Sequence, residues 1–312
     1  MAKHHQLIAG PETVHWGYYD ARLKPVLTVD SGDTVTVHTL SGGPGDVHPD
    51  RKRVPPDLLA IHQKCRHGAG AHIMTGPIAL RGAKPGQALE LRILDIQFRF
   101  DWGYNRFMPL KGTLPEDFPK FHRVFVEIDR EKRLADWGAG VKIPLRPFFG
   151  NIGVAPPPNM GEIPSNPPTE HGGNMDNKEL VPGATLYLPI WNEGALLSIG
   201  DGHGVQGDGE VDQTALETGL VGTFEVRLRE DLTLKLPRAE TPTCYMTMGF
   251  DADLDDAAKT ALREMIDFLS SAKGLSREDA YVLSSLAVDL HITQLVNGNK
   301  GVHATIAKSI VD

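Results

Sequence analysis

The stretch that decides the fold class is residues 88–96, Ala-Leu-Glu-Leu-Arg-Ile-Leu-Asp-Ile. Apolar residues recur at every second position, with Leu89, Leu91 and Ile93 on one side of the backbone. This period of two is typical of a β-strand that buries one face. The preceding residues 84–87, Lys-Pro-Gly-Gln, place proline and glycine where a tight turn needs them. The stretch therefore predicts a strand that follows a turn.

Similar runs occur on both sides of this strand. Residues 34–40 and 222–229 alternate in the same way, and residues 30–33, Asp-Ser-Gly-Asp, predict a hairpin that joins 25–29 to 34–40. Further strands are expected at 195–199 and 211–220, while 98–122 is an aromatic-rich, irregular insert that packs or roofs a pocket. With 33 glycines and 23 prolines, the pattern predicts a mainly β fold: a β-sandwich or barrel-like body of short strands.

The periodicity changes after residue 240. Apolar residues between 254 and 269 follow helical spacing, and Gly274 is placed to end that helix. Ser276 opens a second helix with a capping-box pattern. A strand is expected at 288–295 and another short element at 302–307. We therefore divide the chain into a β-rich catalytic body, 1–240, with a break between two β subdomains near 150–170, and a C-terminal α/β subdomain, 241–312.

Composition excludes several classes of function. The chain has 312 residues and a formal net charge of −8, which disfavours nucleic acid or an anionic membrane as partner. Its N-terminal segment lacks the apolar region of a signal peptide, and no apolar run is long enough to span a membrane. Cys65 and Cys244 form neither a disulfide framework nor a CxxC site. We expect reduced thiols in a cytoplasmic protein, and a dimer as the default for an enzyme of this size.

The strongest candidate for chemistry is residues 200–211, Gly-Asp-Gly-His-Gly-Val-Gln-Gly-Asp-Gly-Glu-Val. Glycine at nearly every second position allows tight folding, and the residues between are types that bind a divalent metal or move protons. Asp201 and His203 would face one way in a strand and could converge in a loop. Asp176 and His72 are the further ligands that we expect from other segments. A solvated surface turn is the alternative reading of this stretch.

Several motifs together resemble the acetamidase/formamidase family. They are residues 75–78 (Thr-Gly-Pro-Ile), 82–86 (Gly-Ala-Lys-Pro-Gly), 172–176 (Gly-Gly-Asn-Met-Asp), 200–203 (Gly-Asp-Gly-His) and 206–210 (Gln-Gly-Asp-Gly-Glu), with the C-terminal 288–304 segment. The resemblance implies a β-rich fold with an α/β C-terminal part. It also implies hydrolysis of short amides to carboxylate and ammonia at a site that binds divalent metal.

The resulting hypothesis is a metal-activated water that attacks the amide carbonyl. Zinc is the expected ion, with Asp176, Asp201, His203 and His72 as ligands. Glu217 or Glu210 would act as general base; if the expected strand includes both, position 210 is even and 217 is odd, so only one of them should face the site. The oxyanion would be stabilised by His15 or by the backbone N–H groups of Gly172 and Gly173. Asn174 and Gln206 are the other residues that we expect to contact the substrate.

Two alternatives stay open at this point. The acidic residues Asp201, Asp208, Glu210 and Asp212 are oxygen donors suited to calcium, either in a non-catalytic β-sandwich protein or as a second, structural ion beside zinc. Histidine at 203 favours a softer metal and hence an enzyme. A metal hydrolase of another linear C–N bond is the second alternative, because the sequence does not reveal the volume of the pocket.

Overall fold

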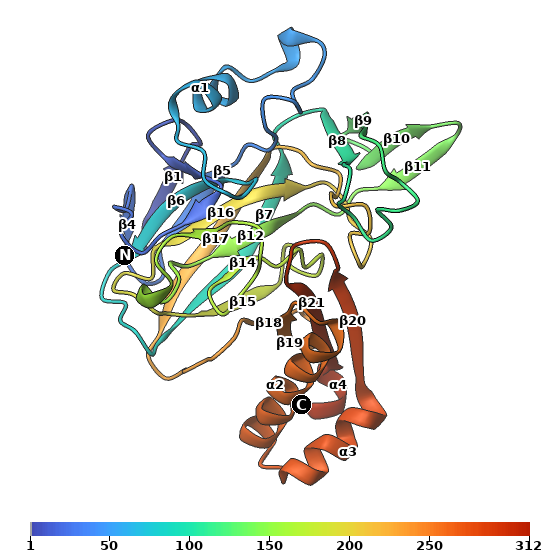
Figure 1. Cartoon of the computed structure of the whole chain (residues 1–312). Coiled ribbons are helices and arrows are strands. Elements are labelled where there is room, and N and C mark those ends of the chain that lie inside the picture. The colour runs from blue at the N-terminus through green and yellow to red at the C-terminus, as the bar shows by residue number, and fades with distance from the viewer. Residues whose placement is uncertain (1) are drawn as a thin grey trace.

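The structure, a computed structural model, describes residues 2–312 and consists mostly of strands, which confirms the predicted fold class. Within these residues the largest sheet has nine strands and extends from the body toward the C-terminal part (Figure 1). Its spatial order is β1 (His4–Leu7), β5 (Thr34–His38), β17 (Leu220–Arg229), β7 (Ala88–Phe98), β15 (Thr185–Pro189), β18 (Arg238–Glu240), β19 (Cys244–Asp251), β21 (Lys300–Ala307) and β20 (Val288–Gln294).

A second sheet supplies the strands that position the site. Its order is β14 (Gly172–Asn174), β12 (Phe148–Gly153), β16 (Leu197–His203), β6 (Ile73–Leu80) and β2 (Val14–Trp16), with β4 (Leu27–Val29) parallel to β6. Two smaller sheets complete the body: β11 (Val141–Pro144), β10 (Leu134–Gly138), β9 (His122–Asp129) and β8 (Trp102–Phe107), then β13 (Ile163–Pro164) with β3 (Tyr18–Tyr19).

The nine-stranded sheet and the second sheet share one apolar cluster. Leu89 and Leu91 of β7 belong to it together with Phe149 of β12 and Ile199 of β16, and all four are fully buried. The predicted strand at 88–96 is thus confirmed, and its apolar face is the one removed from water. Helix α1 (Pro56–Lys64) and the short 3-10 helices Arg51–Arg53 and Pro158–Met160 lie in connections.

The C-terminal elements agree with the sequence pattern. Helix α2 (Leu254–Lys273) ends at Gly274, which has a left-handed φ of 66°, and α3 (Arg277–Ala287) is capped by the Ser276 side chain; α4 (Lys308–Val311) follows β21. A separate apolar cluster joins α2 to β21. The division at residue 240 stays a prediction, since β18 and β19 pair within one sheet across it. No helix in residues 2–312 has the length and apolarity needed to cross a membrane.

The predicted hairpin at 30–33 is wrong. Strand β4 pairs with β6 in the second sheet, whereas β5 pairs with β1 and β17 in the nine-stranded sheet. Asp33 explains the change of sheet, because its carboxylate accepts the backbone N–H groups of Asp30 (3.0 Å) and Lys3 (2.7 Å). The Gly32 N–H donates to the Val226 carbonyl of β17. The turn is therefore tied to neighbouring segments instead of closing a two-stranded ladder.

The predicted strand at 211–220 is wrong as well. β17 begins only at Leu220, and the residues before it form a loop. Successive backbone N–H groups in this loop donate to different segments: Leu216 to Val205, Glu217 to Tyr104, and Thr218 to Gly202. A strand requires one partner strand for the whole run, so these scattered partners exclude it. The 98–122 insert is less irregular than expected, because it contains β8.

Candidate functional site

Strand β16 carries two of the expected ligands on one face. It extends through Asp201 and His203, which lie two residues apart and therefore point the same way. Gly150 lies on the neighbouring strand β12, and a Cβ atom there would be 2.7 Å from Asp201 Oδ2 and from His203 Cε1. It would also overlap Asp176 Oδ1. The glycine at 150 thus leaves the space in which these three side chains meet.

Two further carboxylates complete a buried cluster around His203. Its Nε2 atom lies 3.2 Å from Glu217 Oε1 and 3.3 Å from Asp201 Oδ2, and its Nδ1 atom lies 3.8 Å from Asp176 Oδ1. Glu210 offers a carboxylate oxygen within 4.8 Å of Asp176 and His203. Both glutamates therefore face the cluster. The parity argument that chose between them does not apply, because they lie in a loop.

The backbone is strained at three of these carboxylates. Asp176, Asp201 and Glu210 have φ values of 51°, 58° and 44°, in the left-handed region that residues with a side chain rarely adopt. Such conformations each cost about 1–3 kcal/mol and persist where the surroundings enforce them, often at functional sites. The strain indicates that the fold holds these side chains in place at the expense of local stability.

Gln206 determines which nitrogen of His203 is free. The Gln206 amide N–H donates to the backbone carbonyl of Asp176 at 2.8 Å, which orients its own oxygen toward His203 Nδ1 at 3.0 Å. His203 therefore donates its Nδ1–H to Gln206, and its Nε2 atom faces the carboxylates. A histidine that ligates metal is usually oriented in this manner by a hydrogen bond to its other nitrogen.

The buried polar atoms that lack partners fit a cation. Asp176 Oδ1, His203 Nε2 and Glu210 Oε2 are all buried, and none has a hydrogen-bond partner in residues 2–312. Two groups of three ligand atoms share His203: one with Asp176 and Glu210, the other with Asp201 and Glu217. Unpaired buried acceptors are costly, and a divalent ion satisfies several of them at once. The donor set of one histidine and several carboxylates suits a divalent metal.

The protonation equilibria point to the same conclusion. Burial raises the pKa of Asp176 to about 7 and that of Glu217 to about 7, and it raises the pKa of Glu210 well above its usual range. Burial alone would lower the pKa of His203, but Glu217 and Asp201 hold it well above the ordinary value. Asp176, Glu210 and Glu217 therefore favour a bound proton or cation, whereas His72 and His203 hold the pKa of Asp201 below its usual range against the effect of burial.

His72 and Asn174 lie beside the cluster. His72 Nε2 lies 3.7 Å from Asp201 Oδ2, and its Nδ1 atom is 2.9 Å from Ser165 Oγ. Asn174 donates to Asp176 Oδ2 at 2.9 Å, and a donor that the sequence reading missed, Asn297, binds the same oxygen. Asp176 is therefore held from both sides, with its other oxygen free.

The geometry gives no support to the expected oxyanion role of Gly172, Gly173 and His15. Gly172 donates its N–H to the Thr169 carbonyl at 3.1 Å, and neither Gly172 nor Gly173 lines the pocket described below. His15 lies on β2, two strands from β16, with its nitrogens engaged by Ser198 Oγ at 2.8 Å and the Tyr18 carbonyl. An oxyanion role for these residues stays a prediction.

The later acidic residues of the glycine-rich stretch point elsewhere. Asp208 pairs with Lys178 at 3.0 Å, and Asp212 accepts from Asn105 at 3.2 Å. Neither belongs to a group of converging ligand atoms within the described part of the chain. These contacts do not favour the calcium site that the sequence left open.

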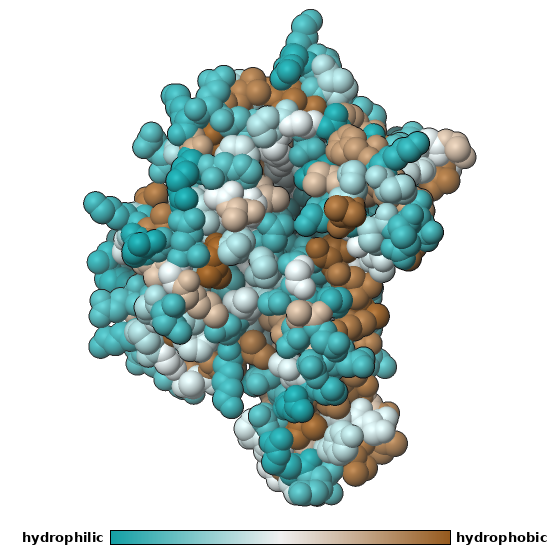
Figure 2. Space-filling view, viewed as in Figure 1, coloured by the Kyte–Doolittle hydropathy of each residue, from teal (hydrophilic) through white to brown (hydrophobic). Residues whose placement is uncertain are grey.

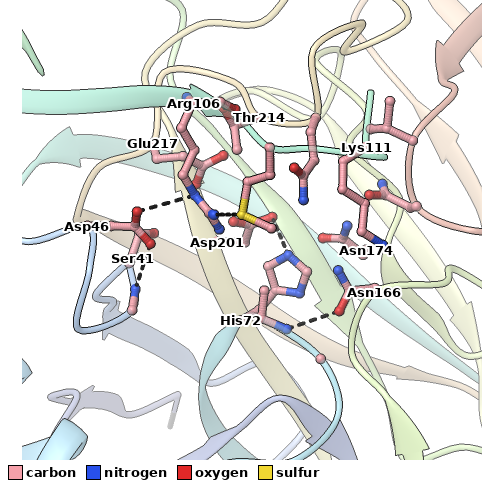
Figure 3. A pocket seen from close by; sticks show the side chains of 18 of the residues that line it. Ser41, Asp46, His72, Arg106, Lys111, Asn166, Asn174, Asp201, Thr214 and Glu217 are labelled. Carbon is pink, nitrogen blue, oxygen red and sulfur yellow. Dashed lines mark hydrogen bonds and ion pairs between the residues drawn. The ribbon is translucent and has the colours of Figure 1, made fainter. Parts of the chain in front are cut away.

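The cluster lies at a pocket of about 480 Å³ (Figure 3). Sequence reasoning missed much of its wall, which includes Asp46, Tyr104, Arg106, Lys111, Asn166 and Asn297. Three of these, Tyr104, Arg106 and Lys111, come from the aromatic-rich insert, whose suggested place over a pocket was the available signal. The others lie in loops that show no periodicity.

Comparison with known proteins identifies the family. The model of the acetamidase/formamidase family matches residues 5–166 and 163–311. The chain belongs to the acetamidase/formamidase family. Within that family, the chain is 27% identical over 299 residues to the formamidase of Methylophilus methylotrophus. The match covers 72% of this chain and 73% of the formamidase.

Solved structures of the family have the same fold. The acetamidase of Bacillus halodurans is 30% identical with a TM-score of 0.86, covering 98% of each chain. The acetamidase of Yersinia enterocolitica is 27% identical with a TM-score of 0.87, covering 99% of this chain and 93% of that one. The similarity thus includes both the β-rich body and the C-terminal elements.

Proposed function

We propose that the protein hydrolyses short-chain linear amides, such as formamide and acetamide, to a carboxylate and ammonia with the help of one divalent ion, for which we propose zinc. The observation that carries the proposal is the set of unpartnered buried atoms around His203 Nε2. Family membership and the amidase names of the relatives support the same reaction.

The residues that would hold the ion are His203, Asp176 and Asp201, with His72 beside them. Because Gln206 occupies Nδ1 of His203, that histidine offers a single ligand atom, which supports one ion rather than two. When bound, such an ion polarises a carbonyl and lowers the pKa of water from 15.7 to about 7. Asn174 and Asn297 keep Asp176 oriented through its second oxygen.

Glu210 is the residue that we propose as general base. Both glutamates line the pocket, but Glu217 Oε1 accepts the Ala215 N–H at 3.2 Å and contacts His203. Glu210 Oε2 also has no partner among the described residues; with His203, Asp176 and Asp201 holding the ion, this oxygen is left beside the ion to take a proton from water and to return one to the departing ammonia. Such proton transfer is worth roughly a hundredfold or more in rate.

The test compares three variants for metal content and for release of ammonia from acetamide. His203→Ala should lose both the metal and the activity. Glu210→Gln should keep the metal and lose about a hundredfold or more in kcat. Glu217→Gln should have a smaller effect on kcat than Glu210→Gln. A His203→Ala variant with full activity and full metal content would sink the assignment.

Two further properties belong to this proposal. We propose a cytoplasmic location, supported by Cys65 and Cys244, which form no disulfide with each other.

We propose a dimer, supported by exposed apolar side chains on α3 and on β20, an edge strand of the nine-stranded sheet. Figure 2 shows apolar surface on this lower part of the molecule, where Val282 is 59% exposed and Leu286 is 80% exposed. Sedimentation equilibrium measures the oligomeric state directly.

A further inference from the structure

The pocket is much larger than a short amide needs. Its volume is about 480 Å³. Formamide has three non-hydrogen atoms and fills on the order of 60 Å³, about the share of two water molecules in the liquid. The rest of the pocket is lined by polar side chains mixed with apolar ones such as Ile73, Met108 and Val296, so the additional volume has polar groups to bind a second functional group of a larger amide.

Two cationic side chains, Arg106 and Lys111, line the pocket away from the cluster around His203. Arg106 and Arg123 both approach the same oxygen of Asp46, at 3.3 Å and 3.5 Å, so a single carboxylate serves two guanidinium groups. Lys111, an exposed residue, also lines the pocket, and in the described part of the chain it forms no salt bridge. An ammonium group that no carboxylate neutralises is suited to binding an anion.

Amide groups beside Lys111 add neutral donors. In Figure 3 the Lys111 side chain points into the pocket on the side where Asn166 and Asn174 lie. The Asn166 side-chain oxygen accepts the Ala71 N–H at 3.0 Å, so the NH2 group of Asn166 points away from Ala71. That NH2 group donates to no acceptor within residues 2–312. An ammonium and an amide donor together are suited to a carboxylate.

We infer that the preferred substrates are amides that carry a carboxylate, that is, the monoamides of short dicarboxylic acids, with Lys111 and Asn166 binding the carboxylate. This inference rests on the proposed function, because the amide end still reacts at the cluster around His203. The amide C–N bond breaks and a C–O bond to water forms. The products are a dicarboxylate and ammonia, and no oxidant or further reactant is needed.

The test compares two amides of nearly equal size, succinamate and 4-oxopentanamide. In 4-oxopentanamide a methyl group replaces one carboxylate oxygen of succinamate, so the negative charge is lost. For the purified metal-loaded protein, kcat/KM should be about 30-fold higher for succinamate, since a hydrogen bond to a charged group is worth roughly one to two factors of ten. Lys111→Met should reduce this ratio to about 1, and Lys111→Arg should restore part of it. Lys120→Met, an exposed lysine in the same connection that does not line the pocket, is the matched control and should keep the ratio.

The outcomes separate this inference from the proposed function. Hydrolysis of acetamide without preference for succinamate would overturn the inference and leave the amidase function intact. An equal loss of the ratio in Lys111→Met and Lys120→Met would also overturn it. If no amide is hydrolysed, calorimetric titration of succinate decides: binding that Lys111→Met weakens about 30-fold supports the anion site, and unchanged binding refutes it.

Discussion

Gln206 offers the sharpest test of how the site is assembled. We expect Gln206→Leu to weaken zinc binding and to reduce kcat/KM for acetamide, although leucine does not remove a ligand. The amide of Gln206 connects two parts of the site, since it accepts from His203 Nδ1 at 3.0 Å and donates to the Asp176 carbonyl at 2.8 Å. Leucine preserves the volume roughly and removes both hydrogen bonds.

The expected magnitude follows from those two contacts. Loss of a partner that orients a metal-binding histidine typically reduces metal affinity or activity by about 10- to 100-fold. The Asp176 carbonyl would be left without its donor in a buried position, which costs about 1–3 kcal/mol of stability. The zinc dissociation constant should therefore rise by about one to two orders of magnitude, and the protein should unfold at a lower urea concentration.

Competition with a chromogenic chelator measures the zinc affinity, and ammonia release measures kcat/KM. Gln97→Leu is the matched control, because Gln97 is exposed on β7 and its amide reaches only Asp95. Gln97→Leu should change neither quantity. If the zinc affinity and kcat/KM of Gln206→Leu both stay within twofold of the unsubstituted protein, the orienting role of Gln206 is refuted.

Two other predictions concern space and protons. Gly150→Ala should abolish zinc binding, measured by metal analysis, because its Cβ would overlap the Asp176 and Asp201 carboxylates and the His203 ring. Gly45→Ala, where an added Cβ meets no atom within 4 Å and φ is not left-handed, is the control, and retention of the metal in Gly150→Ala would contradict the idea. Burial, with His291 alongside, lowers the pKa of His303 to about 4. The unfolded chain, with a pKa near 6.5, therefore binds a proton that the native state does not as pH falls from 6.5 to 4, and this lowers stability by about 3 kcal/mol at pH 4. The variant His303→Gln should remove that part of the pH dependence in urea unfolding from pH 7 to 4; curves parallel to the unsubstituted protein would show that His303 does not contribute.

Local patterns in the sequence were sufficient to predict those elements whose pairing is regular. The alternation at 88–96 gives β7, and the helical spacing with Gly274 and Ser276 gives α2 and α3. In these cases one physical rule determines the structure along the whole segment. The pattern fails at 30–33 and 211–220, where hydrogen bonds to distant segments decide the backbone. Such partners are invisible in a window of ten residues.

The residues of the site fall into the same two groups, those that a local sequence pattern reveals and those that depend on distant segments. Asp201, His203 and Asp176 could be named from residue type and glycine content, because metal ligation restricts the chemistry to a few side chains. Gly150 could not be named, since its importance comes from the absence of a side chain on β12, opposite β16. Lys111 is equally hidden, because a lysine in a loop looks solvated until the fold places it on a pocket wall. The residues that we propose as metal ligands can thus be named from residue type and motif, whereas those that shape the pocket depend on which strands become neighbours.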